Sequence, residues 1–345
     1  MRLVYPGRIV SRNVGGNSTY GRAVMAGVQQ AGFETVEIGF GRNPLSTMLR
    51  ENMARYRGRV TGDLIHYLAD TGPLVGGGSP AVVTVHGIAS RWIDGVRNPA
   101  QEFVWRSRVR RALTTCSAVI TPSSSSAQDI SDVFDIPIEN IAVIPHGIEH
   151  MKSSSPCADV LSDVVERQLR REFILYVGNI EPRKNLEALV AAMGMPSVRE
   201  LGLDLVVAGK PAWNFGAAMS AIERSRDVVY LGYVSDSDRN ALMRRCRAFV
   251  FPSLYEGFGF PVLEALSSGR PVITSDRGSL AEVAGPSYIV EELTSEGIAT
   301  SIVSAMNDDS WLLSCETAGP AWADQFTWKS SVASHIEVYR GVLGE

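Results

Sequence analysis

The chain of 345 residues is poor in the features that mark several classes of protein. It has four cysteines, which are widely spaced and form no Cys-x-x-Cys pair, so the sequence predicts neither a zinc knuckle nor a disulfide framework. No apolar run reaches the length of a membrane-spanning helix, and the first residues are too short and polar for a signal-peptide core. These absences predict a cytoplasmic protein.

The chain also lacks a large excess of charge of either sign. A formal net charge of −4 argues against bulk electrostatic attraction to nucleic acid, so we expect no nucleic-acid partner. Four arginines gather in the segment 105–111, which favours a helix and raises the alternative of peripheral contact with the inner face of a membrane. They are spread around that helix and form no basic stripe, so solvent exposure is the favoured interpretation.

Short apolar runs alternate with helical stretches along the whole chain, a pattern typical of parallel sheets covered by helices on both faces. The length exceeds that of a typical single core, so we expect two domains. Residues 151–158 have linker composition, and the predicted domains are 1–160 and 161–324. The expected strands are 3–5, 35–38, 64–68, 82–85, 118–121, 142–144, 174–177, 205–208, 228–231, 248–251, 272–274 and 289–290.

The segment 253–264 joins an expected buried strand to an expected helix with Pro261 in its first turn. At such a corner of an open α/β sheet, the free backbone N–H groups of the helix favour an anion, most often phosphate. Gly257 and Gly259 let the backbone approach a ligand closely. We therefore interpret this loop as an anion site.

Two carboxylates, Glu256 and Glu264, lie on either side of this loop and would repel a phosphate unless they face other groups. Vicinal hydroxyls are suitable partners, because an ionised carboxylate accepts two charge-assisted hydrogen bonds from a diol. A ligand with diols on both sides of a phosphate is a nucleotide sugar. The alternative is that Glu256 is a solvated loop acid and that Glu264 stabilises the helix dipole.

The spacing Glu256-x7-Glu264, with Gly-Phe-Gly-Phe-Pro between, resembles the signature of retaining GT-B glycosyltransferases of glycosyltransferase family 4. The resemblance extends through 176–185, 205–209, 231–234 and 269–275 and is weaker in the first half. It implies a GT-B fold, with two Rossmann-like doubly wound domains facing across a cleft. The first domain would bind the acceptor, the second would bind the nucleotide-sugar donor, and the helix 325–345 would pack back on the first domain.

The resemblance also implies roles for individual residues. Glu264 would hold the ribose and Glu256 the transferred sugar, while Lys184 matches a diphosphate-binding lysine. Asn179 stands where the family carries an arginine, and Arg183 is the expected substitute. Other positions carried over as catalytic or donor-binding are His86, Gly15, Gly16, Val234, Gly257, Phe258, Gly259, Phe260, Pro261 and Val262.

Plainer interpretations of these positions stay open. His86 follows an expected strand and could be structural, Gly15 and Gly16 could form an ordinary turn, and the two cations could be solvated. Val234 would flank the nucleotide base by resemblance alone.

The sequence has no Asp-x-Asp metal motif in a suitable place, and Arg183 with Lys184 would neutralise a diphosphate, so we expect neither a metal nor a cofactor beside the co-substrate. The resemblance implies front-face transfer, with the leaving phosphate as base, to a glycan, lipid-linked or small-molecule acceptor in polysaccharide or secondary-metabolite biosynthesis. The alternatives are a nucleotide-sugar epimerase or phosphorylase on the same architecture, and a non-catalytic protein that binds a nucleotide sugar.

Overall fold

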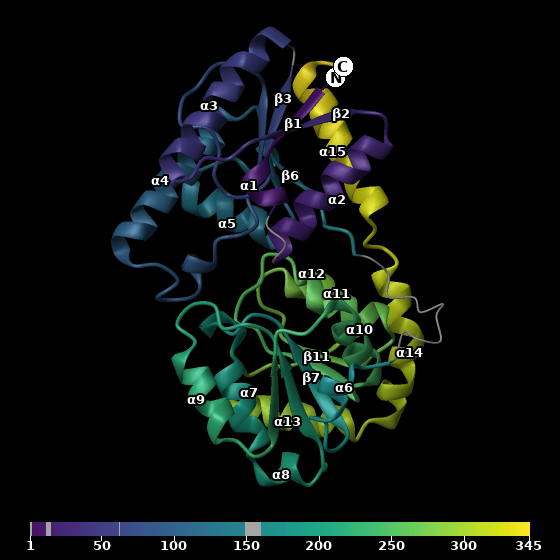
Figure 1. Cartoon of the computed structure of the whole chain (residues 1–345). Coiled ribbons are helices and arrows are strands. Elements are labelled where there is room, and N and C mark those ends of the chain that lie inside the picture. Colours follow the sequence, from purple (N-terminus) through teal and green to yellow (C-terminus); the bar gives the residue numbers. More distant parts are fainter. Residues whose placement is uncertain (1, 12–14, 62, 149–159) are drawn as a thin grey trace. The chain divides into compact units, whose positions relative to one another are not determined.

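The computed structural model describes residues 2–11, 15–61, 63–148 and 160–345 (Figure 1). The chain divides into two compact units: unit 1 contains 1–147 and 326–345, and unit 2 contains 148–325. The linker expected at 151–158 lies outside the described residues.

Unit 1 is built on a parallel sheet that has six strands in its described part, in the order β2-β1-β3-β4-β5-β6. The strands are β1 (Arg2–Pro6), β2 (Glu34–Ile38), β3 (Leu64–Tyr67), β4 (Ala81–Thr84), β5 (Ala118–Thr121) and β6 (Ile141–Val143). The helices are α1 (Gly7–Val10), α2 (Gly16–Gln30), α3 (Pro44–Thr61), α4 (Pro99–Thr115), α5 (Ser124–Phe134) and α15 (Trp328–Leu343), with short 3-10 turns at Ala89–Arg91 and Ile138–Asn140.

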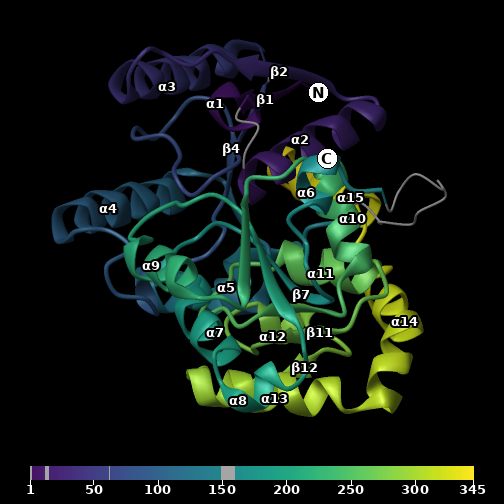
Figure 2. The same cartoon turned by 60° about the horizontal axis from the view of Figure 1, so that its bottom comes forward.

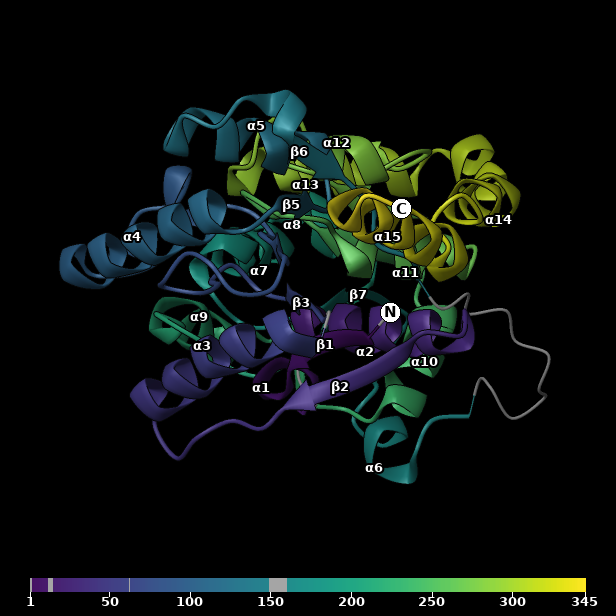
Figure 3. The ribbon, with the colours of Figure 1, turned by 90° about the horizontal axis from the view of Figure 1, so that it is seen from above.

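Helices cover both faces of this sheet, which is why strands such as β3 and β4 are buried throughout. Figure 3 shows α3, α4 and α5 on one side of the strands and α2 with α15 on the other. Helices α2 and α15 pack closely against each other: a Cβ on Gly27 of α2 would lie 2.4 Å from Val332 of α15. The last helix of the chain is therefore part of the core of unit 1.

A buried polar cluster joins α15 to the sheet and to α2. His335 Nδ1 lies 2.7 Å from the carbonyl oxygen of Ser331, so this nitrogen carries the proton and Nε2 accepts one from the Tyr20 hydroxyl at 2.8 Å. Tyr20 then accepts from Thr84 at 2.7 Å, and Thr84 accepts from His66 Nε2 at 2.8 Å. The Ser331 carbonyl thus sets the direction of each hydrogen bond in this series, from His335 through Tyr20 and Thr84 to His66.

Unit 2 contains a second parallel sheet, also of six strands in its described part, in the order β12-β11-β10-β7-β8-β9. The strands are β7 (Phe173–Val177), β8 (Asp204–Ala208), β9 (Val228–Gly232), β10 (Ala248–Phe251), β11 (Val272–Thr274) and β12 (Tyr288–Ile289). The helices are α6 (Asp163–Glu166), α7 (Leu186–Met193), α8 (Pro196–Arg199), α9 (Gly216–Arg224), α10 (Asp236–Arg245), α11 (Phe260–Ser267), α12 (Leu280–Val283), α13 (Ser295–Met306) and α14 (Asp309–Ala323), and η3 (Pro182–Lys184) is a 3-10 turn.

In this second sheet the strands β8, β10 and β11 are completely buried, while the edge strands β9 and β12 are partly exposed. Helix α7 packs with α9 and α13, and α11 packs with α14 (Figure 2). The strands of both units confirm the expected α/β pattern, with ends within one residue of the predicted ones.

The strand order of unit 2 contains a reversal at β7. The chain runs from β7 to β8 and β9 on one side and then returns to place β10 against the other side of β7. In open α/β sheets, ligands bind outside the carboxyl ends of the strands at such a point. The loops that follow β7 and β10 are therefore the first place to look for a site.

Candidate functional site

Two loops meet at the carboxyl ends of β7 and β10. The first passes through η3, which has Pro182 at its first position and is followed by Asn185 with a left-handed φ of 57°. The second runs from the end of β10 to α11. The amide of Leu254 in the second loop donates to the carbonyl of Arg183 in the first at 2.8 Å, which fixes one loop against the other.

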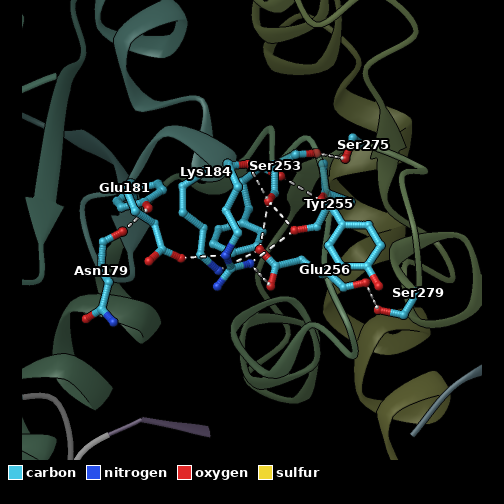
Figure 4. Close-up of polar contacts among 12 residues, drawn as sticks. Asn179, Glu181, Lys184, Ser253, Tyr255, Glu256, Ser275 and Ser279 are labelled. Atoms are coloured by element: carbon cyan, nitrogen blue, oxygen red, sulfur yellow. Dashed lines mark hydrogen bonds and ion pairs between the residues drawn. The ribbon is translucent and has the colours of Figure 1, made fainter. Parts of the chain in front are cut away.

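The side chains of these loops form a cluster of alternating charge (Figure 4). Lys184 Nζ lies 2.5 Å from Glu256 Oε1, and Arg183 Nη1 lies 2.7 Å from Glu256 Oε2. Arg183 Nε also lies 2.5 Å from Glu181 Oε1. Two cations and two anions thus balance each other within the cluster.

Glu256 is the anion that both cations share, and its side chain is buried. Burial alone would raise the pKa of Glu256, but the charges of Arg183 and then Lys184 outweigh it and lower this pKa to about 2. The Ser253 hydroxyl lies within donating distance of Glu256 Oε1 at 2.7 Å. The two carboxylate oxygens can accept about four hydrogen bonds, so these partners leave capacity for a ligand hydroxyl.

Lys184 lies deeper than Arg183: its side chain is 7% exposed, and its Nζ is 4.5 Å from the centre of the Phe251 ring. Burial and the neighbouring charge of Arg183 lower the pKa of Lys184 to about 8, against the opposing effect of Glu256. Arg183 differs, because the two carboxylates raise its pKa despite burial. The lysine can therefore lose its charge under mildly basic conditions, whereas the arginine cannot.

The backbone around Glu256 is held by serines from the next segment. Both the amide and the hydroxyl of Ser279 lie 3.0 Å from the Glu256 carbonyl oxygen, and the Ser275 hydroxyl donates to the Ser253 carbonyl at 2.5 Å. Gly278 makes this approach possible, since a Cβ there would lie 2.6 Å from the Glu256 carbonyl. The carboxylate is therefore fixed from its backbone as well as from its side chain.

Helix α11 begins at Phe260, with Pro261 in its first turn as predicted. Gly259 precedes it as the N-cap residue, with a left-handed φ of 101°, and as a glycine it has no side chain with which to cap the helix. A Cβ on Gly259 would lie 2.8 Å from Leu280, so only glycine fits without displacement. Phe258 is buried and makes an edge contact with Phe260, at 5.2 Å between ring centres.

The structure places the remaining predicted residues as follows. Glu264 is half-buried within α11, Gly257 and Val262 lie in the loop and first turn, and Val234 follows the edge strand β9. The structure thus brings Arg183, Lys184 and Glu256 together, whereas Val234 follows β9, which is two strands away from β7 in the sheet. The binding of the ribose by Glu264 and of the base by Val234 both stay predictions.

His86, Gly15 and Gly16 belong to unit 1. His86 Nε2 donates to the Leu68 carbonyl at 2.8 Å, and its Nδ1 lies 3.3 Å from His146 Nε2. Burial lowers the pKa of His86, which keeps the ring neutral near pH 7. Gly15 has a left-handed φ of 88° and precedes α2, whose first residue is Gly16.

Sequence reasoning missed two residues of the cluster, Glu181 and Ser253. Glu181 is two residues before Arg183, and Ser253 is three residues before Glu256, so the spacing in each loop was the available signal. It also missed the close contact of Gly178 and Gly209, where a Cβ on Gly209 would lie 1.8 Å from the Gly178 carbonyl oxygen. This contact joins the loops that follow β7 and β8.

The described part of the chain lacks two further features. In that part of the chain, no group of three or more His, Cys, Asp or Glu side chains is arranged to hold a metal ion. Likewise, none of the described helices combines the length and the apolar character that crossing a membrane requires.

The fold and the site at the switch point define the class: two doubly wound units, with a charged cluster at the reversal of the second, are the architecture of a GT-B glycosyltransferase. Residues 160–322 match the family described as Glycosyl transferases group 1, and residues 28–152 match the one described as Glycosyltransferase Family 4. The chain belongs to glycosyltransferase family 4.

A relative of higher identity agrees with this assignment, and two solved structures agree with the fold. The chain is 32% identical over 238 residues to O-antigen chain mannosyltransferase B of Escherichia coli, a match that covers 67% of this chain and 62% of that protein. Sucrose-phosphate synthase from Thermosynechococcus elongatus is 18% identical with a TM-score of 0.78, over 99% of this chain and 98% of that one. HepE of Anabaena, solved in complex with UDP-glucose, is 16% identical with a TM-score of 0.75, over 98% and 100%. The two structures share the fold.

Proposed function

We propose that this protein is a retaining, metal-independent glycosyltransferase that moves a sugar from a nucleotide-diphosphate sugar to an acceptor hydroxyl. The observation that carries the proposal is the pairing of Arg183 and Lys184 with Glu256 at the carboxyl ends of β7 and β10. Two cations at this point suit a diphosphate, and a carboxylate with spare acceptor capacity suits the hydroxyls of a sugar.

In the proposed reaction, the acceptor oxygen forms a bond to C1 of the sugar while the bond from C1 to the diphosphate oxygen breaks. Negative charge builds on the leaving phosphate, where Arg183 and Lys184 stabilise it. The acceptor proton passes to that phosphate on the same face of the sugar, so the configuration at C1 is kept. Because the two side chains supply the positive charge, the proposal requires no metal.

Mannose is the sugar we propose first, because a relative at 32% identity is named a mannosyltransferase. Glucose is the second candidate, since HepE, which shares only the fold, was solved with UDP-glucose. A thermal-shift panel of nucleotide sugars tests both, because a ligand at a hundred times its dissociation constant stabilises the folded state by about 2.7 kcal/mol.

Turnover of the donor then separates an enzyme from a protein that only binds it. We expect slow hydrolysis of the selected donor without acceptor, undiminished by excess EDTA, and an α-configured product from an α-configured donor by NMR. Stabilisation by a nucleotide sugar without any hydrolysis or transfer would favour the binding-protein alternative. An inverted product would overturn the retaining mechanism.

A further inference from the structure

Helix α3 of unit 1 has an exposed face that is apolar, which is the reverse of the usual arrangement in a surface helix. Leu45, Leu49, Met53 and Tyr56 follow each other at helical spacing of four, four and three residues, and each is more than half exposed. Figure 1 shows α3 as an outer helix of unit 1. The apolar face of this helix is therefore largely exposed, and at Met53 it borders a cavity that β1 and β2 also line.

The opposite face of α3 is charged and buried. Glu51 and Arg55 are each 4% exposed, although charged side chains are seldom so deeply buried. Glu51 Oε1 lies 2.8 Å from Arg8 Nε, and Arg55 donates to the carbonyls of Ser79 at 3.1 Å and Thr115 at 2.7 Å. These contacts prevent the helix from rotating to bury its apolar face, because rotation would leave the charges unpaired.

Two arginines border the apolar face. Arg50 and Arg57 lie three residues before and four residues after Met53, which places both next to it on the helix surface, and both are exposed. Glu51 is the only acidic residue in the α3 sequence, and it points inward. We call the set Leu45, Leu49, Arg50, Met53, Tyr56 and Arg57 the α3 surface.

A cavity of about 560 Å³ adjoins the α3 surface and is lined by Arg50, Met53 and Arg57 from the helix and by residues of β1 and β2. The strands contribute the apolar side chains of Val4, Val36 and Ile38. Of the acids in its wall, Asp63 is paired with Arg2 at 2.7 Å, and Glu37 also lines it. Apolar surface next to guanidinium groups thus continues from the helix into this cavity.

We propose that the α3 surface docks on a lipid bilayer that contains anionic headgroups. Exposed leucine, methionine and tyrosine side chains suit the boundary between headgroups and acyl chains, and flanking arginines suit lipid phosphates. A second copy of the chain fits less well, because a two-fold contact would bring the arginines of both copies to the same interface. This docking goes beyond the proposed reaction and does not depend on it.

Vesicle flotation of the full chain tests the proposal. Wild type is expected to float with vesicles of phosphatidylcholine and phosphatidylglycerol, more weakly with phosphatidylcholine alone, and less well in high salt. The double variant Leu49→Ser/Met53→Ser should lose at least about tenfold in vesicle affinity. Leu313→Ser, at a leucine on α14 that is even more exposed, is the control and should bind like wild type.

A second pair of variants tests the charges. Arg50→Gln/Arg57→Gln should remove the preference for phosphatidylglycerol, whereas Arg224→Gln, at an exposed arginine on α9, should keep it. Thermal unfolding of each variant checks that it is folded. Wild type that fails to float with either vesicle, or a double variant that floats as well as wild type, would overturn the inference. If wild type self-associates in sedimentation velocity and Leu49→Ser/Met53→Ser abolishes this self-association, the inference is overturned in favour of a second copy. Nucleotide-sugar binding measured on the same variants reports on the proposed function separately.

Discussion

Lys184 and Glu256 form a buried ion pair across two loops that are 72 residues apart in the chain, with 2.5 Å between Nζ and Oε1. The carboxylate lies in a site that would otherwise strongly favour anions. Without ligand, Glu256 takes the place of an anion between Arg183 and Lys184. A diphosphate that enters must share the cations with this carboxylate.

The first prediction concerns pH and Lys184. Because burial and Arg183 lower the pKa of Lys184 to about 8, affinity for a nucleoside diphosphate should fall as pH rises through that value. In the unfolded chain the lysine keeps its ordinary pKa of 10.5. Between these two pH values the unfolded state binds more protons than the folded state, so the contribution of Lys184 to the free energy of unfolding rises with pH. A loss of affinity in this range therefore cannot be explained by unfolding.

Calorimetric titration of the diphosphate across this range measures the effect. Lys184→Arg is the control, since a guanidinium stays charged, and its affinity should be nearly constant with pH. Identical pH profiles for wild type and Lys184→Arg would refute the assignment of the titrating group.

The second prediction separates the two carboxylates. Glu256→Gln leaves buried Lys184 without its paired charge, so we expect a loss of about 3–5 kcal/mol in the free energy of unfolding, together with a large loss of turnover. Its affinity for the nucleoside diphosphate should persist, because the cations become more available. Glu264→Gln should cost less than about 1 kcal/mol in stability but weaken diphosphate binding about tenfold.

Urea unfolding, calorimetry and turnover of the two variants check this division. If both lost nucleotide affinity equally with their folding intact, the roles would have been divided wrongly.

The third prediction concerns the start of α11. Gly259→Ala places a side chain at a left-handed φ of 101° and 2.8 Å from Leu280, which should cost about 1–3 kcal/mol in stability and disturb the loop. Gly216, the first residue of α9, has nothing within 4 Å of a built Cβ, so Gly216→Ala should be neutral or stabilising. Thermal unfolding of both proteins measures the difference, and equal stability would show that the turn tolerates a side chain.

The fourth prediction follows from the buried histidines around Tyr20. Burial lowers the pKa of His335 from 6.5 to about 4. As pH falls from about 6.5 to 4, His335 becomes protonated in the unfolded chain but stays neutral in the folded chain. The contribution of this residue should therefore lower the free energy of unfolding by up to about 3 kcal/mol.

His66 and His146 also have lowered pKa values, so wild type should lose stability steeply in this range. Urea unfolding at several pH values should show a shallower dependence for His335→Gln than for wild type. An unchanged slope would mean that another group is responsible for the acid sensitivity.

The strands could be predicted from the sequence because sheets covered on both faces require continuous apolar runs, as in β8 and β10. Helix α3 could not, because its apolar residues point outward and its buried face carries Glu51 and Arg55. The apolar residues of such a helix do recur at helical spacing, but this spacing would predict that the apolar face is buried, whereas it is exposed. Nothing in the sequence shows that the charges on it have partners at Arg8 and Ser79.

The candidate site was predicted in part. Arg183, Lys184 and Glu256 each follow an expected strand, and strand ends are where α/β proteins bind ligands. Their mutual pairing was not predictable, because it depends on β10 returning to lie beside β7, and strand order is decided by packing of the whole sheet. Glu181 and Ser253 acquire their roles only through that order.

The core of unit 1 contains α15, so its chain is not contiguous. During synthesis, residues 148–325 can complete their own sheet while the first sheet still lacks the helix that covers one of its faces. Tyr20, Val24 and Val28 on α2 then lack the contacts that α15 adds to their side of the core until the final helix leaves the ribosome. The half of the protein that is made first is therefore the half that finishes folding last, and a nascent chain stalled before residue 326 exposes this apolar layer to chaperones and proteases.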